Sequence, residues 1–440
     1  MLVSQSQKDM STPATNSSPS FRSRSLFPAF FLLTYPAFTL LVNGGASAIS
    51  IAAAVISLAL LLSPKSWTGL TPIQWDGVDM RFCLAMASVL AAVLIGEMWH
   101  GVVIPSTLDS PSRFLVAAPL FLVLRQGLPR TLVWSDLSFA IGALTSLGIL
   151  LIAPQGLGNG RISSPFLNAI HYGDIALILG ALSILSLNWW RKDSLPVRVI
   201  KIAGLIAGLA ASVLTGSRGG WIAVPVVAAL ILYVRGRGKS RRWKVLLPLA
   251  IVAMLAGIFV FSSGARERVG DISSDLMLYK HGQRDTSLGV RLQLYEAAVQ
   301  IVKNHPLLGL GAHGFRDSMQ SFADAGMLTP MAAQLGRGET HNQFFAYLTN
   351  YGIVGGLALL SIYVVPGVIF WNRLSAPAGP ANRAALMGLT FVVAFWIFGL
   401  TVETFDLKMT VSFYATMVAI LTALATNEYK ASSAARVPPQ

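Results

Sequence analysis

The chain has 440 residues, of which 54% are hydrophobic and only 12% are charged, with a formal net charge of +14. A soluble protein of this size carries more charge than this on its surface, so the composition excludes a soluble globular fold. The mean hydropathy of +0.62 and runs of about 18–20 apolar residues predict membrane-spanning helices.

Twelve apolar stretches are predicted to span a membrane. In chain order they are 26–43, 46–63, 81–98, 112–126, 136–153, 168–188, 198–214, 219–234, 244–262, 351–371, 384–402 and 409–427. The expected fold is therefore an all-α, polytopic membrane protein with about twelve transmembrane helices and one large helical loop. Residues 1–25 are expected to be a disordered cytoplasmic tail, 26–262 the first nine spans, 263–340 the loop, 341–427 the last three spans and 428–440 a second tail.

The distribution of Lys and Arg predicts the orientation of these spans. The two termini and the even-numbered gaps hold 21 of these residues, the short odd-numbered gaps hold 4, and the long loop holds 8. Positive residues favour the cytoplasmic side of a membrane. Both termini are therefore expected to be cytoplasmic, and the loop to face outward.

The most basic stretch, residues 235–244, is interpreted as an anchor on anionic lipid rather than a nucleic-acid patch. Membrane lipid is thus an expected partner, and nucleic acid is not. Cys83 is the only cysteine, which rules out an intramolecular disulfide, and no Cys/His metal pattern is present. Neither a metal nor a cofactor is predicted.

Few charged residues lie inside the predicted spans, and no internal repeat is visible. Both observations weaken a transporter interpretation. The exceptions noted are His171 and Asp174, near the outer start of the sixth span. One interpretation is that both side chains extend to the membrane interface. The other places them on the rim of an outer cavity, where they would contact a substrate.

The long loop is predicted to contain an amphipathic helix over about residues 288–304, capped by Ser287 and ended by Pro306. Its apolar stripe is expected to consist of Leu288, Leu292, Tyr295, Val299 and Val302. Arg291 and Tyr295 are four residues apart and should share a face. That face would hold the Arg291 guanidinium near the membrane surface, where Arg291 and Tyr295 are candidate substrate-binding residues.

Three glycines after this helix, Gly309, Gly311 and Gly314, match a dinucleotide-binding spacing. No strand precedes them, so the match is attributed to chance. The glycines are expected to allow a tight turn between two loop helices. His313 lies in this turn and could line a site.

Arg218 lies in the short outer turn Thr215–Trp221, between two glycine-flanked spans. It is either an interfacial anchor or an anion-binding group. The planar guanidinium suits phosphate oxygens, and the start of the next span would add backbone N–H donors. The remaining loop arginines, among them Arg266, either bind an anion or form a solvated surface that is balanced by the loop's acidic residues.

His341 is the strongest candidate for a catalytic residue. It opens the helix leading into the tenth span, with Phe345 and Leu348 on its face. A helix N-terminus disfavours the imidazolium, so a neutral His341 could accept a proton from an alcohol. The alternative is an ordinary interfacial histidine.

Four segments together resemble the O-antigen ligase and polymerase superfamily: Ser217–Trp221, Arg291–Ala298, Asn304–Gly311 and Thr340–Phe344. They lie within about residues 215–356. The resemblance implies a glycosyltransferase-C-like membrane fold, a bacterial inner-membrane location and a periplasmic active site. It also implies that Arg218, Arg291 and His341 match the functional arginines and histidine of the family, with Asn342 beside them.

The ligase branch transfers O-antigen from undecaprenyl diphosphate to lipid A-core oligosaccharide, which completes lipopolysaccharide. The expected reaction is an inverting, metal-independent transfer, in which the arginines bind the diphosphate and His341 is the general base. Alternatives are an O-antigen polymerase, a protein O-oligosaccharyltransferase and, from a different class, a polyprenyl-glycan transporter.

Overall fold

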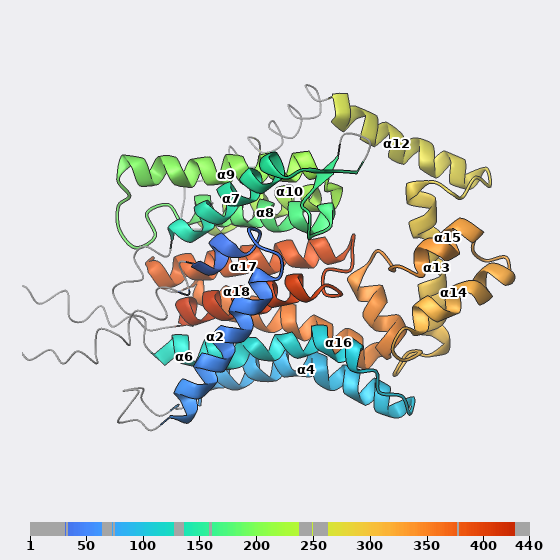
Figure 1. The fold of residues 1–440 in the computed structure, drawn as a ribbon, viewed down its shortest axis with the longest axis horizontal. Helices are drawn as coiled ribbons and strands as arrows, with labels where there is room; N and C mark the ends of the chain where they lie inside the picture. Colours follow the sequence, from blue (N-terminus) through green and yellow to red (C-terminus); the bar gives the residue numbers. More distant parts are fainter. Residues whose placement is uncertain are drawn as a thin grey trace, which may run out of the picture.

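A computed structural model shows a bundle of long helices with a smaller helical region at one end (Figure 1). The structure describes residues 31–426 apart from 32–33, 64–72, 74, 127–135, 158–160, 237–248, 250–262 and 376–377. The two expected tails, most of the basic stretch 235–244 and, apart from Leu249, the predicted span 244–262 lie outside the described residues.

The bundle and the smaller region account for almost all of the described secondary structure. The bundle consists of α2 (Gly45–Leu62), α4 (Gly77–Trp99), α5 (Pro105–Ser112), η1 (Arg113–Val116), α6 (Ala117–Gln126), α7 (Leu137–Ile152), α8 (Ala169–Leu185), α9 (Leu195–Thr215), α10 (Arg218–Gly236), α16 (Gln343–Arg373), α17 (Pro380–Gly399) and α18 (Lys408–Thr426). The smaller region, called the loop lobe below, consists of α12 (Ser263–Lys280), α13 (Ser287–Asn304), α14 (Gly314–Asp324) and α15 (Pro330–Gly336). Two short antiparallel strands, β1 (Gln155–Gly156) and β2 (Ile162–Ser163), join α7 to α8.

Within the described residues, eight helical segments are long and apolar enough to cross a membrane, and α7 and α8 are shorter apolar helices. These ten segments coincide with ten of the twelve predicted spans. The all-α, polytopic fold is therefore confirmed. Of the first predicted span, 26–43, the structure describes only residues 31 and 34–43.

Helix α18 lies in the middle of the bundle, and its residues from Met409 to Thr426 are all buried. Helices α8 and α9 pack closely because glycines face each other across the contact. A Cβ on Gly208 would lie 2.9 Å from the Gly180 Cα. By contrast, Val55 on α2 and Leu84 on α4 are each 61% exposed, as expected for side chains that face lipid.

Helix α16 is interrupted at Gly352, whose φ of 60° and ψ of −155° are not helical. The freed backbone groups are paired with the loop that follows α13. Ile353 N donates to Pro306 O at 2.8 Å, and Gly311 N donates to Asn350 O at 2.8 Å. Gly309 and Gly311 both have positive φ, so the predicted glycine turn is confirmed. Its function is to pair with the break in α16.

The loop lobe has its own apolar core, formed by α13, α14 and α15. The lobe core uses the face of α13 opposite the predicted stripe, and its buried side chains are Val290, Leu294, Ala297, Ala298 and Ile301. Tyr295 of the predicted stripe packs instead on Phe345 of α16. Both faces of α13 are apolar, so periodicity alone did not identify the buried one. The predicted cap is also one residue off, since the Thr286 hydroxyl accepts the Gly289 N–H and the helix begins at Ser287.

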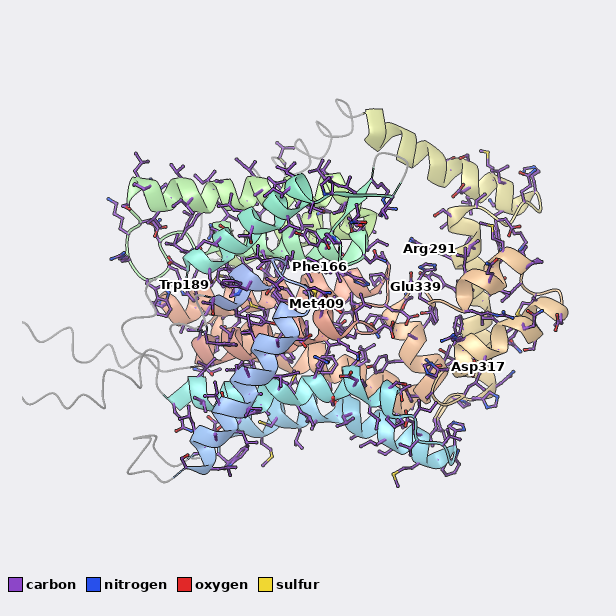
Figure 2. All side chains as sticks on the ribbon, in the orientation of Figure 1. Phe166, Trp189, Arg291, Asp317, Glu339 and Met409 are labelled. Atoms are coloured by element: carbon purple, nitrogen blue, oxygen red, sulfur yellow. The ribbon has the colours of Figure 1, made fainter. Side chains whose placement is uncertain are left out.

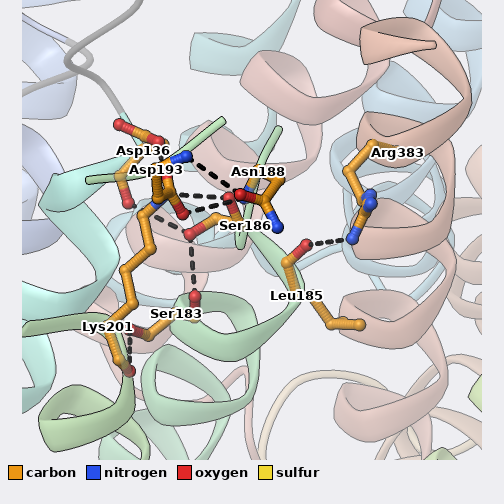
Figure 3. A network of polar contacts seen from close by, with 8 residues as sticks. All are labelled: Asp136, Ser183, Leu185, Ser186, Asn188, Asp193, Lys201 and Arg383. Carbon is orange, nitrogen blue, oxygen red and sulfur yellow. Dashed lines mark hydrogen bonds and ion pairs between the residues drawn. The ribbon is translucent and has the colours of Figure 1, made fainter. Parts of the chain in front are cut away.

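The bundle holds more buried charge than the sequence suggested, so the interpretation that the spans nearly lack it is wrong. Lys201 is fully buried at the end of the bundle opposite the loop lobe. Its ammonium contacts the carboxylates of Asp136 and Asp193 and donates to Ser186 O at 2.8 Å (Figure 3). These contacts compensate the cost of burying the charge and tie α7 and the α8–α9 connection to α9. Glu97 on α4 is also buried and accepts hydrogen bonds from Ile104 N and Thr107.

Candidate active site

The segment from Glu339 to Gln343 connects the loop lobe to α16 and lies between the lobe and the bundle. Asn342 caps α16, because its Oδ1 accepts from Phe344 N at 2.9 Å and Phe345 N at 3.1 Å. Its Nδ2 donates to Leu400 O at 3.2 Å. The polar atoms of Asn342 are thus used to fix the segment, while a direct contact with substrate remains a prediction.

His341 precedes this cap and has a φ of 56°, a left-handed conformation that is uncommon for a residue other than glycine. The Tyr295 hydroxyl donates to His341 O at 3.1 Å, and the Tyr295 ring packs on Phe345 at a centroid distance of 5.0 Å. Strained backbone of this kind persists only where the surroundings enforce it, and it concentrates at functional sites.

Glu339 is a neighbour of His341 that the sequence analysis missed. Its Oε1 lies 2.5 Å from His341 Nδ1, although the two groups are not aligned for a good hydrogen bond. Poor alignment is common in active sites without substrate. Burial would raise the pKa of Glu339, but the contact with His341 and the charge of His171 hold that pKa below its usual value.

The connection between α17 and α18 closes another side of the site. Thr340 N donates to the carboxylate of Glu403, and Phe405 N donates to Gln343 Oε1 at 2.6 Å. Burial raises the pKa of Glu403 to about 7, against the opposing effect of the hydrogen bonds from Thr340. A carboxyl group that titrates near neutral pH is therefore bonded to the residue next to His341.

His171 and Asp174 lie on the first turns of α8 and are 5% and 2% exposed. The interpretation that they extend to the membrane interface is therefore wrong. His171 is close enough to Glu339 for their charges to interact. Asp174 Oδ1 accepts the Ser217 hydroxyl at 2.6 Å, and a Cβ on Gly220 would lie 2.6 Å from the same oxygen. Asp174 thus occupies part of the α10 N-terminus, where free N–H donors for an anion were expected.

Arg218 is the first residue of α10, and its side chain lies outside the described residues. Its backbone is held between neighbours on both sides. A Cβ on Gly219 would overlap the Thr401 hydroxyl, and Arg161 Nε donates to Thr215 O at 3.0 Å. Arg161 is a second arginine at this turn, and the sequence analysis did not select it because it is distant from Arg218 in the chain.

Arg291 and Tyr295 lie one turn apart on α13, as predicted. Burial raises the pKa of the Tyr295 hydroxyl, the charge of Glu339 adds to this effect, and the charge of Arg291 opposes it. Arg291 and Glu339 both lie on the side of the loop lobe that faces the bundle (Figure 2). Arg291, Tyr295 and Glu339 therefore share one electrostatic environment with His341.

The two remaining candidates lie further from His341. His313 is exposed at the N-cap of α14. Partial burial and the charge of Glu339 raise the pKa of Asp406, while the charge of His313 opposes this, so His313 borders the α17–α18 connection. Arg266 belongs to the first turn of α12, and its side chain lies outside the described residues. Among described residues, no group of three or more His, Cys, Asp or Glu is arranged to hold a metal ion.

The family model described as O-antigen ligase matches residues 203–360, a stretch that contains Arg218, Arg291 and His341. This match supports a relationship to the O-antigen ligase superfamily. The apolar helices and this match indicate a multi-pass membrane protein.

Two curated proteins are similar to this chain. A protein of Haemophilus influenzae described as uncharacterized is 27% identical over 306 residues, which cover 68% of this chain and 74% of that protein. A protein of Escherichia coli K12 described as O-antigen ligase is 24% identical over 207 residues, which cover 47% of this chain and 48% of that protein. The second match therefore spans about half of the E. coli protein.

Proposed function

We propose that this protein transfers O-antigen from undecaprenyl diphosphate to lipid A-core oligosaccharide, at the periplasmic face of the bacterial inner membrane. Both termini would then be cytoplasmic. The observation that carries the proposal is the arrangement of His341. The Tyr295 hydroxyl donates to its backbone carbonyl, and the adjacent Asn342 caps α16. Its Nδ1 faces a carboxylate, within the segment that matches the O-antigen ligase model.

In this proposal, a hydroxyl group of the acceptor sugar gives its proton to Nε2 of His341 and attacks the anomeric carbon of the donor. The bond from that carbon to the diphosphate oxygen breaks, and undecaprenyl diphosphate leaves with an additional negative charge. A single displacement inverts the anomeric carbon. General-base assistance of this kind contributes about 10²–10⁴-fold to a rate.

Arg218 and Arg291 bind the diphosphate and stabilise the charge that develops on it. The two arginines come from the bundle and from the loop lobe, so the donor would lie between them. The proposal assigns charge neutralisation to these arginines rather than to a metal ion. Asp174 has a positioning role here, because its contact with Ser217 fixes the start of α10 next to Arg218.

The other candidates border the same space and are assigned substrate contacts of lesser weight. His171 faces Glu339 from the bundle. His313 lies at the edge near Asp406, where it could contact the acceptor sugar. Arg266, at the start of α12, would contact the anionic donor only if that helix approaches it.

A reconstituted transfer assay tests this proposal. Purified protein receives polyprenyl-diphosphate glycan and lipid A-core, with and without EDTA, and is compared with His341→Asn. Asparagine tolerates the left-handed backbone, so this variant removes the base without adding strain. We expect glycan on lipid A-core in the wild type, unaffected by EDTA, and a loss of about 10²–10⁴-fold in the variant with donor binding retained.

The matched control is His281→Asn, at an exposed histidine of the loop lobe, which should transfer at the wild-type rate. Full activity of His341→Asn would contradict the general-base role. Loss of transfer in EDTA would contradict the metal-independent reaction. Elongation of glycan on the polyprenyl carrier, with none on lipid A-core, would instead identify a polymerase.

A further inference from the structure

Glu339 is placed to control the ring of His341. It lies two residues before the histidine, and the left-handed backbone at His341 brings the two side chains together, with 2.5 Å between Oε1 and Nδ1. Neither side chain lies on the open surface, since 20% of His341 and 29% of Glu339 is exposed. At a partly buried site, a carboxylate interacts more strongly with an imidazole than it does in water.

The surroundings keep Glu339 ionised and in place. His171 on α8 is close enough to Glu339 for an electrostatic interaction between the two side chains. The contact with His341 is the main effect that holds the pKa of Glu339 below its usual value, against the opposing effect of burial. An ionised Glu339 accepts hydrogen bonds and donates none.

We propose that Glu339 is a positioning residue for the transfer reaction, which accepts the Nδ1–H of His341 and thereby leaves Nε2 free to receive a proton. This inference rests on the proposed function, in which His341 is the base. When the acceptor O–H bond breaks, the proton moves to Nε2 and the ring becomes an imidazolium. Glu339 stabilises that cation without taking the proton. The proton leaves Nε2 for solvent after the product has departed.

Three variants separate this role from a merely structural one. Glu339→Gln can still accept the Nδ1–H through its amide oxygen but lacks the charge. Glu339→Asp keeps the charge on a side chain that is one methylene shorter. Glu296→Gln is the control, because Glu296 is an exposed residue of α13 that pairs with Arg284.

For Glu339→Gln, we expect kcat to fall by about tenfold to a thousandfold, with the KM for the donor unchanged. The acidic limb of the pH profile of kcat should move to lower pH, because the carboxylate that favours a protonated His341 ring is gone. Glu339→Asp should recover part of kcat, and Glu296→Gln should match the wild type.

Other titratable or charged groups face this region and must be accounted for. They are His171 on α8, Arg291 and Tyr295 on α13, His313 at α14, and Glu403 and Asp406 between α17 and α18. Glu403 titrates near neutral pH, because burial raises its pKa to about 7, so its titration could also appear in the pH profile of kcat. The profile is therefore also measured in a Glu403→Gln background, where the shift caused by Glu339→Gln should persist.

A second measurement does not depend on glycan transfer. Nitrogen-15 NMR of labelled histidine, with the His341 signal assigned through His341→Asn, reports which ring nitrogen carries the proton. We expect the Nδ1–H form in the wild type, and a ring that protonates at lower pH in Glu339→Gln.

The outcomes are distinguishable. Unchanged kcat and pH profile in Glu339→Gln, or a lower kcat with an unshifted profile, would overturn the proposal for Glu339, as would an Nε2–H form in the wild type. Full transfer by His341→Asn would refute the proposed base, and with it the mechanism, whatever Glu339 does.

Discussion

Replacing Gly352 with alanine should destabilise the protein because the break in α16 depends on this glycine. Its φ of 60° and ψ of −155° lie in a region that is open essentially only to glycine. A Cβ at this position would overlap the Leu307 carbonyl and lie 2.5 Å from Leu308 N. These are backbone atoms, so no side-chain rotation relieves the overlap.

Two contributions set the magnitude. The strained backbone costs about 1–3 kcal/mol. Relieving it moves the loop away from α16 and weakens the bonds from Ile353 N to Pro306 O (2.8 Å) and from Val354 N to Leu307 O (3.4 Å), at about 1 kcal/mol each. The free energy of unfolding should therefore fall by about 3–5 kcal/mol.

Thermal unfolding in detergent, followed by a thiol-reactive dye, measures this effect. Cys83 is the only cysteine and lies on α4, which packs against α16. The control is Gly367→Ala in the same helix, where the nearest atom, Val392 Cγ1, is 4.0 Å from the added Cβ. The control should be neutral or slightly stabilising. Equal unfolding midpoints for Gly352→Ala and the wild type would refute the reasoning.

Three further predictions concern the site. Gly219→Ala should lower the rate of glycan transfer, because the added Cβ displaces the turn that carries Arg218. The control is Gly236→Ala at the other end of α10, where the added Cβ has open space around it and the transfer rate should not change. Burial raises the pKa of Glu403 from 4.5 to about 7, so the folded protein retains a proton that the unfolded chain loses, and stability falls as pH rises through this window. Glu403→Gln should then equal the wild type at pH 4 and exceed its stability above pH 7 by up to about 3 kcal/mol. Melting curves without that divergence would contradict the shifted pKa. Arg291→Lys keeps the charge but loses the planar fork, so the KM for the donor should rise about tenfold, while Arg316→Lys, on the exposed face of α14, should leave it unchanged.

The membrane spans could be predicted from sequence because a span needs a long apolar run, and composition reveals such runs directly. The orientation of α13 could not. Its two faces, one with Leu292 and Val299 and the other with Leu294 and Ala298, are both apolar, and only the packing of α14 and α15 identifies the buried face. The buried charge of Lys201 could not be predicted for a similar reason, since its partners Asp136 and Asp193 are brought to it by the fold.

In the candidate site, too, some residues could be predicted from the sequence and others could not. His341 was predicted from its position ahead of a helix and from the resemblance to a family. Glu339 was not, because residues two apart do not face each other in a helix, and the left-handed backbone of His341 that joins them is not visible in the sequence. The contacts from Glu403, Asp174 and Arg161 come from distant parts of the chain, which periodicity does not bring together.

The pairing of the α16 break with residues 306–311 has a consequence for synthesis of the protein. A helix interrupted at the membrane leaves N–H and C=O groups that lipid cannot satisfy. Because the chain grows from its N-terminus, residues 306–311 are made before residues 350–354, and the partner of the break is already present when α16 enters the membrane. A circular permutation that moved the loop lobe behind α16 would reverse this order, and the new chain would insert with the break unpaired.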